Sequence, residues 1–283
     1  MDGLHSGRAL YRFDADEAPS TYITNYVVTV ICVVGVIAHY AKPPAGGSSP
    51  VTLLLIIHLA LYAIVYLLGG LGHQVWKHNR CPGIEMPANT TIACPPGGLD
   101  NEPVISTYLF FLGPCELQLL PMAVALSGLA GKCTFTLKSP FVLVANVVGL
   151  AFGILGCALG HGGFIILGAL MLLLYLLLAI ACAVGCCTVG MGAGRGLVAA
   201  GALLVVIGGA IQFLLGGACG SAAYLADGAA SCPFGGDGVS GINHNFVYHV
   251  FEILSKLCLV AALRFLGAEK KESSMELGQG IDA

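Results

Sequence analysis

Charged residues are scarce in this chain of 283 residues: only 10% are charged, whereas 57% are hydrophobic. A soluble globular chain carries about 25% charged residues. A larger soluble core does not explain the deficit, because a soluble surface of this size would need more charge. A lipid bilayer facing most of the surface does explain it. The net charge of −3 is weak, so we expect no nucleic-acid partner.

The first twenty residues lack the apolar stretch of a cleavable signal peptide. We therefore expect the first hydrophobic segment to direct insertion, and a location in the secretory pathway or plasma membrane. No lipidation signal is present at either end. A spanning helix needs about 20 mostly apolar residues. Seven segments qualify, and they lie near residues 22–41, 51–72, 105–129, 139–160, 163–185, 197–218 and 244–266.

The sequence thus predicts an all-α, seven-transmembrane helix bundle over residues 22–266. A segment of residues 1–21 precedes it, and a polar tail of residues 267–283, expected to be disordered, follows it. Lysine and arginine placement favours an outer N-terminus and a cytosolic C-terminus. Of the 12 Lys and Arg, seven then lie on the cytosolic side, four lie outside and Lys256 lies in the membrane. Asn89, in Asn89-Thr90-Thr91, is a glycosylation acceptor, which functions only outside.

Cysteine placement agrees with this orientation. Of 12 Cys, four lie in or beside the outer loops near residues 73–104 and 219–243. We expect disulfides between Cys81 and Cys94 and between Cys219 and Cys232, which would cap the loops, because the outer compartments are oxidising. Four cysteines allow three connectivities. The remaining cysteines are expected to be free thiols or small core residues.

Glycines recur in the fourth predicted span, at Gly149, Gly153, Gly156 and Gly160. Small residues at this spacing allow two helices to approach closely. We expect helix packing here rather than a binding site.

The last span carries a polar stripe. On a helix of about 100° per residue, Asn245, His249, Glu252 and Lys256 fall within a sector of about 60°. Such a stripe must face the interior of the bundle, because charged groups facing lipid are costly. Glu252 precedes Lys256 by four residues, the favourable order for a helical ion pair. The pair could simply neutralise itself and fix helix packing.

Glu116 lies near the middle of the third span, with no basic residue nearby on its own helix. It could pair with Lys256, or it could be protonated, because burial disfavours a charged carboxyl group. Asn146 and Gln212 are expected to form hydrogen bonds between helices.

The second predicted span ends in Gly69-Gly70-Leu71-Gly72-His73, and the last begins Asn245-Phe246-Val247-Tyr248-His249. These residues and the span count resemble the superfamily of alkaline ceramidases and adiponectin-receptor-like proteins. Those proteins have seven spans and a zinc site built from Ser-x-x-x-His in span two, an acidic residue and His-x-x-x-His in the last span. His73 and His249 match two of the histidines. Gly69 replaces the serine, Asn245 replaces the other histidine, and the acidic residue is missing from its usual place.

The resemblance implies a possible zinc site held by His73 and His249. A catalytic zinc takes three protein ligands, and Glu252 is the third candidate. His244 is an alternative, but it lies about 140° around the helix from His249. With Glu252 as a ligand, Glu116 would have to act as the base. Glu116 and Lys256 are thus the catalytic candidates.

Three functions follow from these residues. The first is a zinc-dependent hydrolase of membrane lipid amides. The second is a transporter, channel or proton-linked protein that uses the buried Glu, His and Lys groups and needs no metal. The third is a degenerate relative that binds something through its outer loops. A retinal Schiff base on Lys256 is disfavoured, because the spans are poor in aromatic residues.

Overall fold

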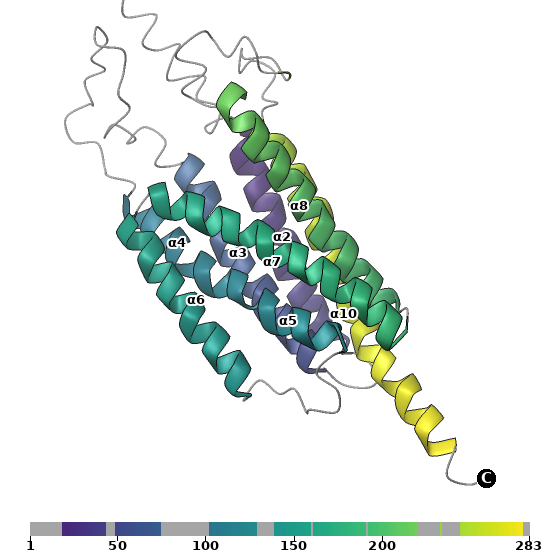
Figure 1. The fold of residues 1–283 in the computed structure, drawn as a ribbon. Helices are drawn as coiled ribbons and strands as arrows, with labels where there is room; N and C mark the ends of the chain where they lie inside the picture. The colour runs from purple at the N-terminus through teal and green to yellow at the C-terminus, as the bar shows by residue number, and fades with distance from the viewer. Residues whose placement is uncertain are drawn as a thin grey trace, which may run out of the picture.

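The computed structural model describes residues 19–43, 49–74, 102–128, 139–159, 161–190, 192–219, 233 and 244–279. This part of the chain is helical, and Figure 1 shows the helices side by side in one bundle. The helices are α2 (Pro19–Ala41), α3 (Pro50–Gln74), α4 (Glu102–Leu117), α5 (Leu119–Leu126), α6 (Pro140–Leu159), α7 (His161–Thr188), α8 (Ala193–Cys219) and α10 (His244–Gln279).

The predicted fold class is confirmed. Within the described residues, seven segments are long and apolar enough to cross a membrane, and α4 and α5 together form the third of them, Ser106–Leu126. Each agrees with its predicted counterpart to within a few residues. Because the number of described spans is odd, the start of the first span and the end of the last span lie on opposite sides of the membrane. An outer N-terminus stays a prediction.

The spans form a closed ring in chain order. Each span contacts the next along the chain, and α10 returns to contact α2. Contacts across the ring join α10 to α3 and join both α4 and α5 to α7. Residues on the interior faces of α3, α4, α7 and α10 can therefore meet at the centre of the bundle. Outward faces carry exposed Val, Ile and Leu side chains, as a lipid-facing surface requires.

Backbones of α4 and α6 touch at glycines. An ideal Cβ added at Gly153 would lie 2.5 Å from the Phe110 carbonyl oxygen, so only a hydrogen fits there. In a regular helix the Phe110 carbonyl would accept a hydrogen bond from the N–H of residue 114, but Pro114 has no N–H. The exposed peptide edge of Phe110 faces the glycine of the neighbouring helix. Gly113 and Gly149 make a similar approach, so the predicted packing role of Gly149 and Gly153 is confirmed. Gly160 lies outside the described residues.

The third span breaks at Gln118, which separates α4 from α5. Pro121 lacks the N–H that would bond to the Leu117 carbonyl, so the helical ladder is interrupted at this turn. The Gln118 side-chain amide donates a hydrogen bond to Asn146 Oδ1 on α6. The predicted role of Asn146 between helices is confirmed.

Some predictions fall on residues that the structure does not describe. Cys81, Cys94, Cys232 and Asn89 lie outside the described residues, and Cys219 ends α8 without a described side chain. The two disulfides and the glycosylation therefore stay predictions. The cysteines with described side chains are free thiols, as expected for this set, which comprises Cys32, Cys115, Cys157, Cys182, Cys186, Cys187 and Cys258.

The last helix runs further than the sequence predicts. The polar composition after residue 266 predicts a disordered tail, which stays a prediction, and α10 is helical to Gln279. This change in composition marks where the helix leaves the apolar layer, since the candidate span ends at Leu266. It does not mark the end of the helix.

Candidate functional site

All four residues of the polar stripe on α10 face the interior, as predicted. Asn245 and His249 each expose 7% of their surface, and Glu252 and Lys256 expose none. The predicted ion pair is formed: Lys256 Nζ lies 2.9 Å from Glu252 Oε2. A buried ammonium group needs compensation on all sides, because the bilayer offers it no water.

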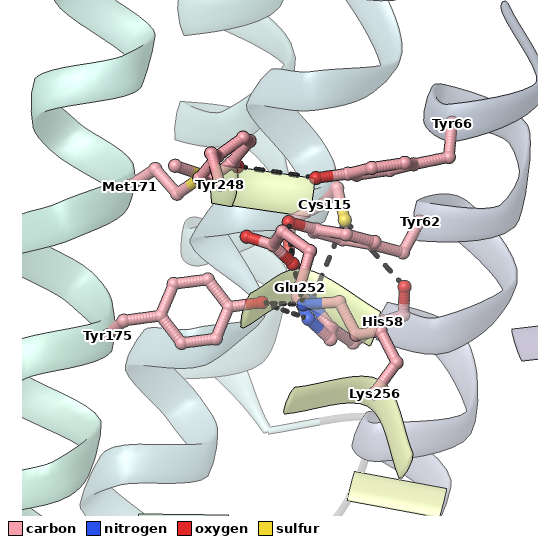
Figure 2. A network of polar contacts seen from close by, with 9 residues as sticks. All are labelled: His58, Tyr62, Tyr66, Cys115, Met171, Tyr175, Tyr248, Glu252 and Lys256. Carbon is pink, nitrogen blue, oxygen red and sulfur yellow. Dashed lines mark hydrogen bonds and ion pairs between the residues drawn. The ribbon is translucent and has the colours of Figure 1, made fainter. Parts of the chain in front are cut away.

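Compensation for Lys256 comes from two tyrosines on other helices. Its ammonium donates a hydrogen bond of 2.9 Å to the hydroxyl of Tyr175 on α7. It also lies over the ring of Tyr62 on α3, 3.6 Å from the ring centroid. The face of an aromatic ring attracts a cation, most strongly where water is excluded. Figure 2 shows Lys256 enclosed by these groups.

The hydrogen-bond directions around His58 are determined by its partners. His58 Nδ1 lies 3.0 Å from the Cys115 carbonyl oxygen, which can only accept, so Nδ1 carries the proton. In the neutral ring Nε2 is then the acceptor, and the hydroxyl of Tyr175 donates to it over 2.9 Å. Tyr175 thus accepts from Lys256 and donates to His58. A continuous chain of hydrogen bonds runs from α10 through α7 to α3 and α4.

A second tier of tyrosines lies above this chain in Figure 2. Tyr66 stacks on Tyr62, with ring centroids 4.8 Å apart. The Tyr66 hydroxyl donates to that of Tyr248 over 3.2 Å, and Tyr248 points its hydroxyl at the sulfur of Met171, 3.8 Å away. Tyr62 itself donates to Glu252 Oε2 over 3.0 Å. The Glu252 carboxylate is therefore bound by the Tyr62 hydroxyl from α3 as well as by Lys256.

The polar stripe continues toward the start of α10. His249 Nδ1 lies 2.8 Å from the hydroxyl of Thr24 on α2, and its ring packs against that of Tyr66. One turn further, Asn245 Oδ1 accepts a hydrogen bond of 2.6 Å from the side-chain amide of Gln212 on α8. The predicted role of Gln212 between helices is confirmed.

Glu116 is fully buried on α4, and neither of its carboxyl oxygens has a hydrogen-bond partner among the described residues. It lies within electrostatic range of both members of the ion pair, so Lys256 attracts its charge and Glu252 repels it. Of the two predicted alternatives for Glu116, an ion pair with Lys256 is not observed, because the lysine makes its ion pair with Glu252. Protonation of Glu116 is the alternative that is left.

The three proposed zinc ligands are not shown together. Glu252 is bonded to Lys256 and Tyr62, and His249 contacts Thr24. Residue 73 lies seven residues beyond Tyr66 on α3, a rise of about 10 Å, and the side chain of His73 is outside the described part. Among described residues, no group of three or more His, Cys, Asp or Glu side chains could hold a metal ion.

Sequence reasoning missed the α3 contribution to the site. His58, Tyr62 and Tyr66 are spaced by four residues, so they share one helix face. That spacing is visible in the sequence, but a tyrosine in an apolar span is first interpreted as an aromatic core residue, and His58 lies 15 residues from His73 along α3. Tyr175 carries no such signal, because it is a lone tyrosine in an apolar span.

Comparison with known proteins gave no match: no protein-family model, no curated protein and no solved structure matches the chain at a significant level. The class of protein is therefore defined by the fold and its buried network. The chain is a multi-pass integral membrane protein with charged and phenolic groups at the centre of its helix bundle.

Proposed function

We propose that this is a proton-linked membrane protein, which binds and releases one proton at the cluster of Glu116, Glu252 and Lys256. The observation that carries the proposal is the balance of charge in the core. Two acidic residues and one lysine are fully buried, and no other Asp, Glu, Lys or Arg is buried among the described residues. One ammonium group cannot neutralise two carboxylates.

With both carboxyl groups ionised, the cluster carries a net charge of −1. An uncompensated charge at membrane depth costs several kcal/mol or more. One added proton makes the cluster neutral. Glu252 is the ionised member, because it accepts from both Lys256 and Tyr62. Glu116 has no donor on either oxygen, so it is the group that holds the proton.

Losing that proton changes the forces on Lys256. An ionised Glu116 competes with Glu252 for the single ammonium, and the hydrogen bond from Lys256 to Tyr175 is strained by any displacement of the lysine. Tyr175 also holds His58, which binds the Cys115 carbonyl at the residue before Glu116. The protonation state of α4 is thus linked to the packing of α3, α7 and α10. Such a linkage suits a transporter or a proton-sensing protein.

The zinc hydrolase hypothesis has less support. A zinc-bound Glu252 would have to sit beside the ammonium of Lys256, only 2.9 Å from it, and like charges repel. The zinc content of the purified protein, compared with a His73→Ala, His249→Ala variant, decides this point. Zinc lost in the variant would favour the hydrolase. Membership of the ceramidase and adiponectin-receptor superfamily is likewise a proposal, to which the seven-span ring conforms.

The proposal is tested by infrared difference spectroscopy of the purified protein in detergent during a pH titration. A protonated carboxyl group in a dry site has a resolved carbonyl stretching band. We expect one such band that titrates, and we expect it to disappear in Glu116→Gln. In Glu252→Gln, Lys256 is released to pair with Glu116, so the band should be lost there because Glu116 becomes ionised rather than because it is removed. A wild-type protein without a titrating band, or a band that persists in Glu116→Gln, would overturn the proposal.

A further inference from the structure

The buried polar stripe of α10 extends along about half of the bundle. From Asn245 to Lys256 they follow α10 for 11 residues, a rise of about 16 Å, against a hydrocarbon thickness of about 30 Å. Exposure falls along this path, from 7% at Asn245 and His249 to zero at Glu252 and Lys256. The path begins where α10 begins and α3 ends, at the end of the bundle opposite the C-terminus in Figure 1.

Leucines close the other half. One helical turn beyond each residue of the hydrogen-bond chain, on the side away from His249, lies a leucine with no exposed surface. The four leucines are Leu55 one turn from His58, Leu119 one turn from Cys115, Leu178 one turn from Tyr175 and Leu259 one turn from Lys256.

These four side chains come from α3, α5, α7 and α10, and all are part of the buried hydrophobic core. We call them the leucine layer. Buried polar groups on its far side are Thr52, which bonds to Ser49 at the start of α3, Ser127, which bonds to the Val124 carbonyl, and His39 near the end of α2. Gln118, level with the layer, bonds to Asn146 on α6. The hydrogen bonds of Thr52 and Gln118 do not lead to the buried cluster.

We propose that protons reach the buried cluster from one side of the membrane only, through Thr24 and His249, and that the leucine layer blocks access from the other side. This inference rests on the proposed function and adds a direction to it. It makes the site a one-sided proton acceptor in this conformation, rather than a proton channel.

His249 is a titratable side chain on α10 that lies between the start of the path and the ion pair. Its ring contacts Thr24 on α2 and Tyr66 on α3, and Tyr66 bonds to Tyr248, one turn before Glu252. An imidazole can accept a proton on one nitrogen and release it from the other. The titratable groups around the ion pair are Cys32 on α2, His58, Tyr62 and Tyr66 on α3, Tyr108, Cys115 and Glu116 on α4, Tyr175 on α7 and Tyr248 on α10.

Sealed vesicles with the full chain inserted in one orientation provide the test. The pH is stepped on one side at a time with membrane-impermeant buffers, and the Glu116 infrared band is followed. We expect a response to the step on the side where α10 begins and none, on the same timescale, to the step on the other side. His249→Phe should slow the response by about tenfold or more, equivalent to about 1.4 kcal/mol on the barrier.

The leucine layer is tested with Leu259→Ser, which should admit a response from the second side. Leu257→Ser is the matched control, because Leu257 is on the same helix but 48% exposed, and it should leave the one-sided response unchanged. If a variant does not fold, the response of the wild-type protein to the two pH steps still tests whether access is one-sided. Equal responses to both steps, a response only from the C-terminal side, or none from either side would each overturn the inference. If the band titrates in detergent, the proposed function survives that result; if it does not, both fail.

Discussion

Lys256 Nζ lies 3.6 Å from the centre of the Tyr62 ring, while the hydroxyl of the same tyrosine donates to Glu252, the lysine's ion-pair partner. One side chain thus stabilises both charges, with its ring face toward the cation and its hydroxyl toward the anion. Because these two contacts use different atoms, substitutions can separate them.

Tyr62→Phe keeps the ring and removes only the hydrogen bond to Glu252. We expect it to lower the free energy of unfolding by about 1–3 kcal/mol, the usual effect of leaving a buried charged acceptor short of one donor. Tyr62→Leu also removes the ring face and should cost about 2 kcal/mol more. Denaturant unfolding in detergent micelles measures both variants. Equal costs for the two would show that the ring does not stabilise Lys256.

Lys256→Met should be strongly destabilising, by about 3–5 kcal/mol, because it leaves the Glu252 carboxylate buried without its partner. The double variant Lys256→Met, Glu252→Gln removes both charges and should recover most of that loss. Thermal unfolding of the three proteins in parallel gives the comparison. If the double variant is as unstable as Lys256→Met, loss of packing rather than the unpaired charge is the cause.

Gly153→Ala should separate α4 from α6, because the added Cβ would meet the backbone of Phe110, which cannot move aside as a flexible side chain can. We expect a loss of stability of several kcal/mol, at the upper end of overpacking effects. Gly196→Ala is the matched control, since nothing lies within 4 Å of the position that its added Cβ would take. A tolerated Gly153→Ala would mean that the two helices are further apart in the membrane.

Orientation is tested at Asn89. If the loop between α3 and α4 lies outside, the protein made in mammalian cells should carry an N-linked glycan there, because only lumenal sequons are modified. We expect a glycosidase-sensitive shift in gel mobility that Asn89→Gln abolishes. An acceptor sequon engineered after Gln279 should stay unmodified. Modification there and not at Asn89 would reverse the predicted topology, and with it the side from which the cluster is reached.

Much of the fold was predictable, because it follows from one physical requirement. A chain whose apolar segments are about 20 residues long has few alternatives to helices in a bilayer. The same requirement fixed the inward direction of the α10 stripe, since Glu252 and Lys256 could not face lipid. Glycine spacing predicted a close helix contact, although only the structure shows that the partner backbone is that of Phe110.

The partners of the stripe were not predictable, because they depend on which helices are neighbours. Nothing in the α10 sequence says that Tyr175 of α7 and Tyr62 of α3 reach its lysine. The ring order decides that, and helix order in space is not encoded in apolar periodicity. Glu116 illustrates the same limit, since its lack of a donor appears only when all its neighbours are placed.

The interruption at Gln118 divides the third span into two helical segments that can bend relative to one another. A continuous helix moves as one rigid unit, but α4 and α5 meet at a turn where Pro121 leaves the Leu117 carbonyl without its helical hydrogen bond. Glu116 is two residues from that turn, so a small bend there could swing its carboxyl group toward or away from Lys256 while the far ends of the span stay anchored. An interruption of the helical ladder and the buried acid of the third span are therefore adjacent.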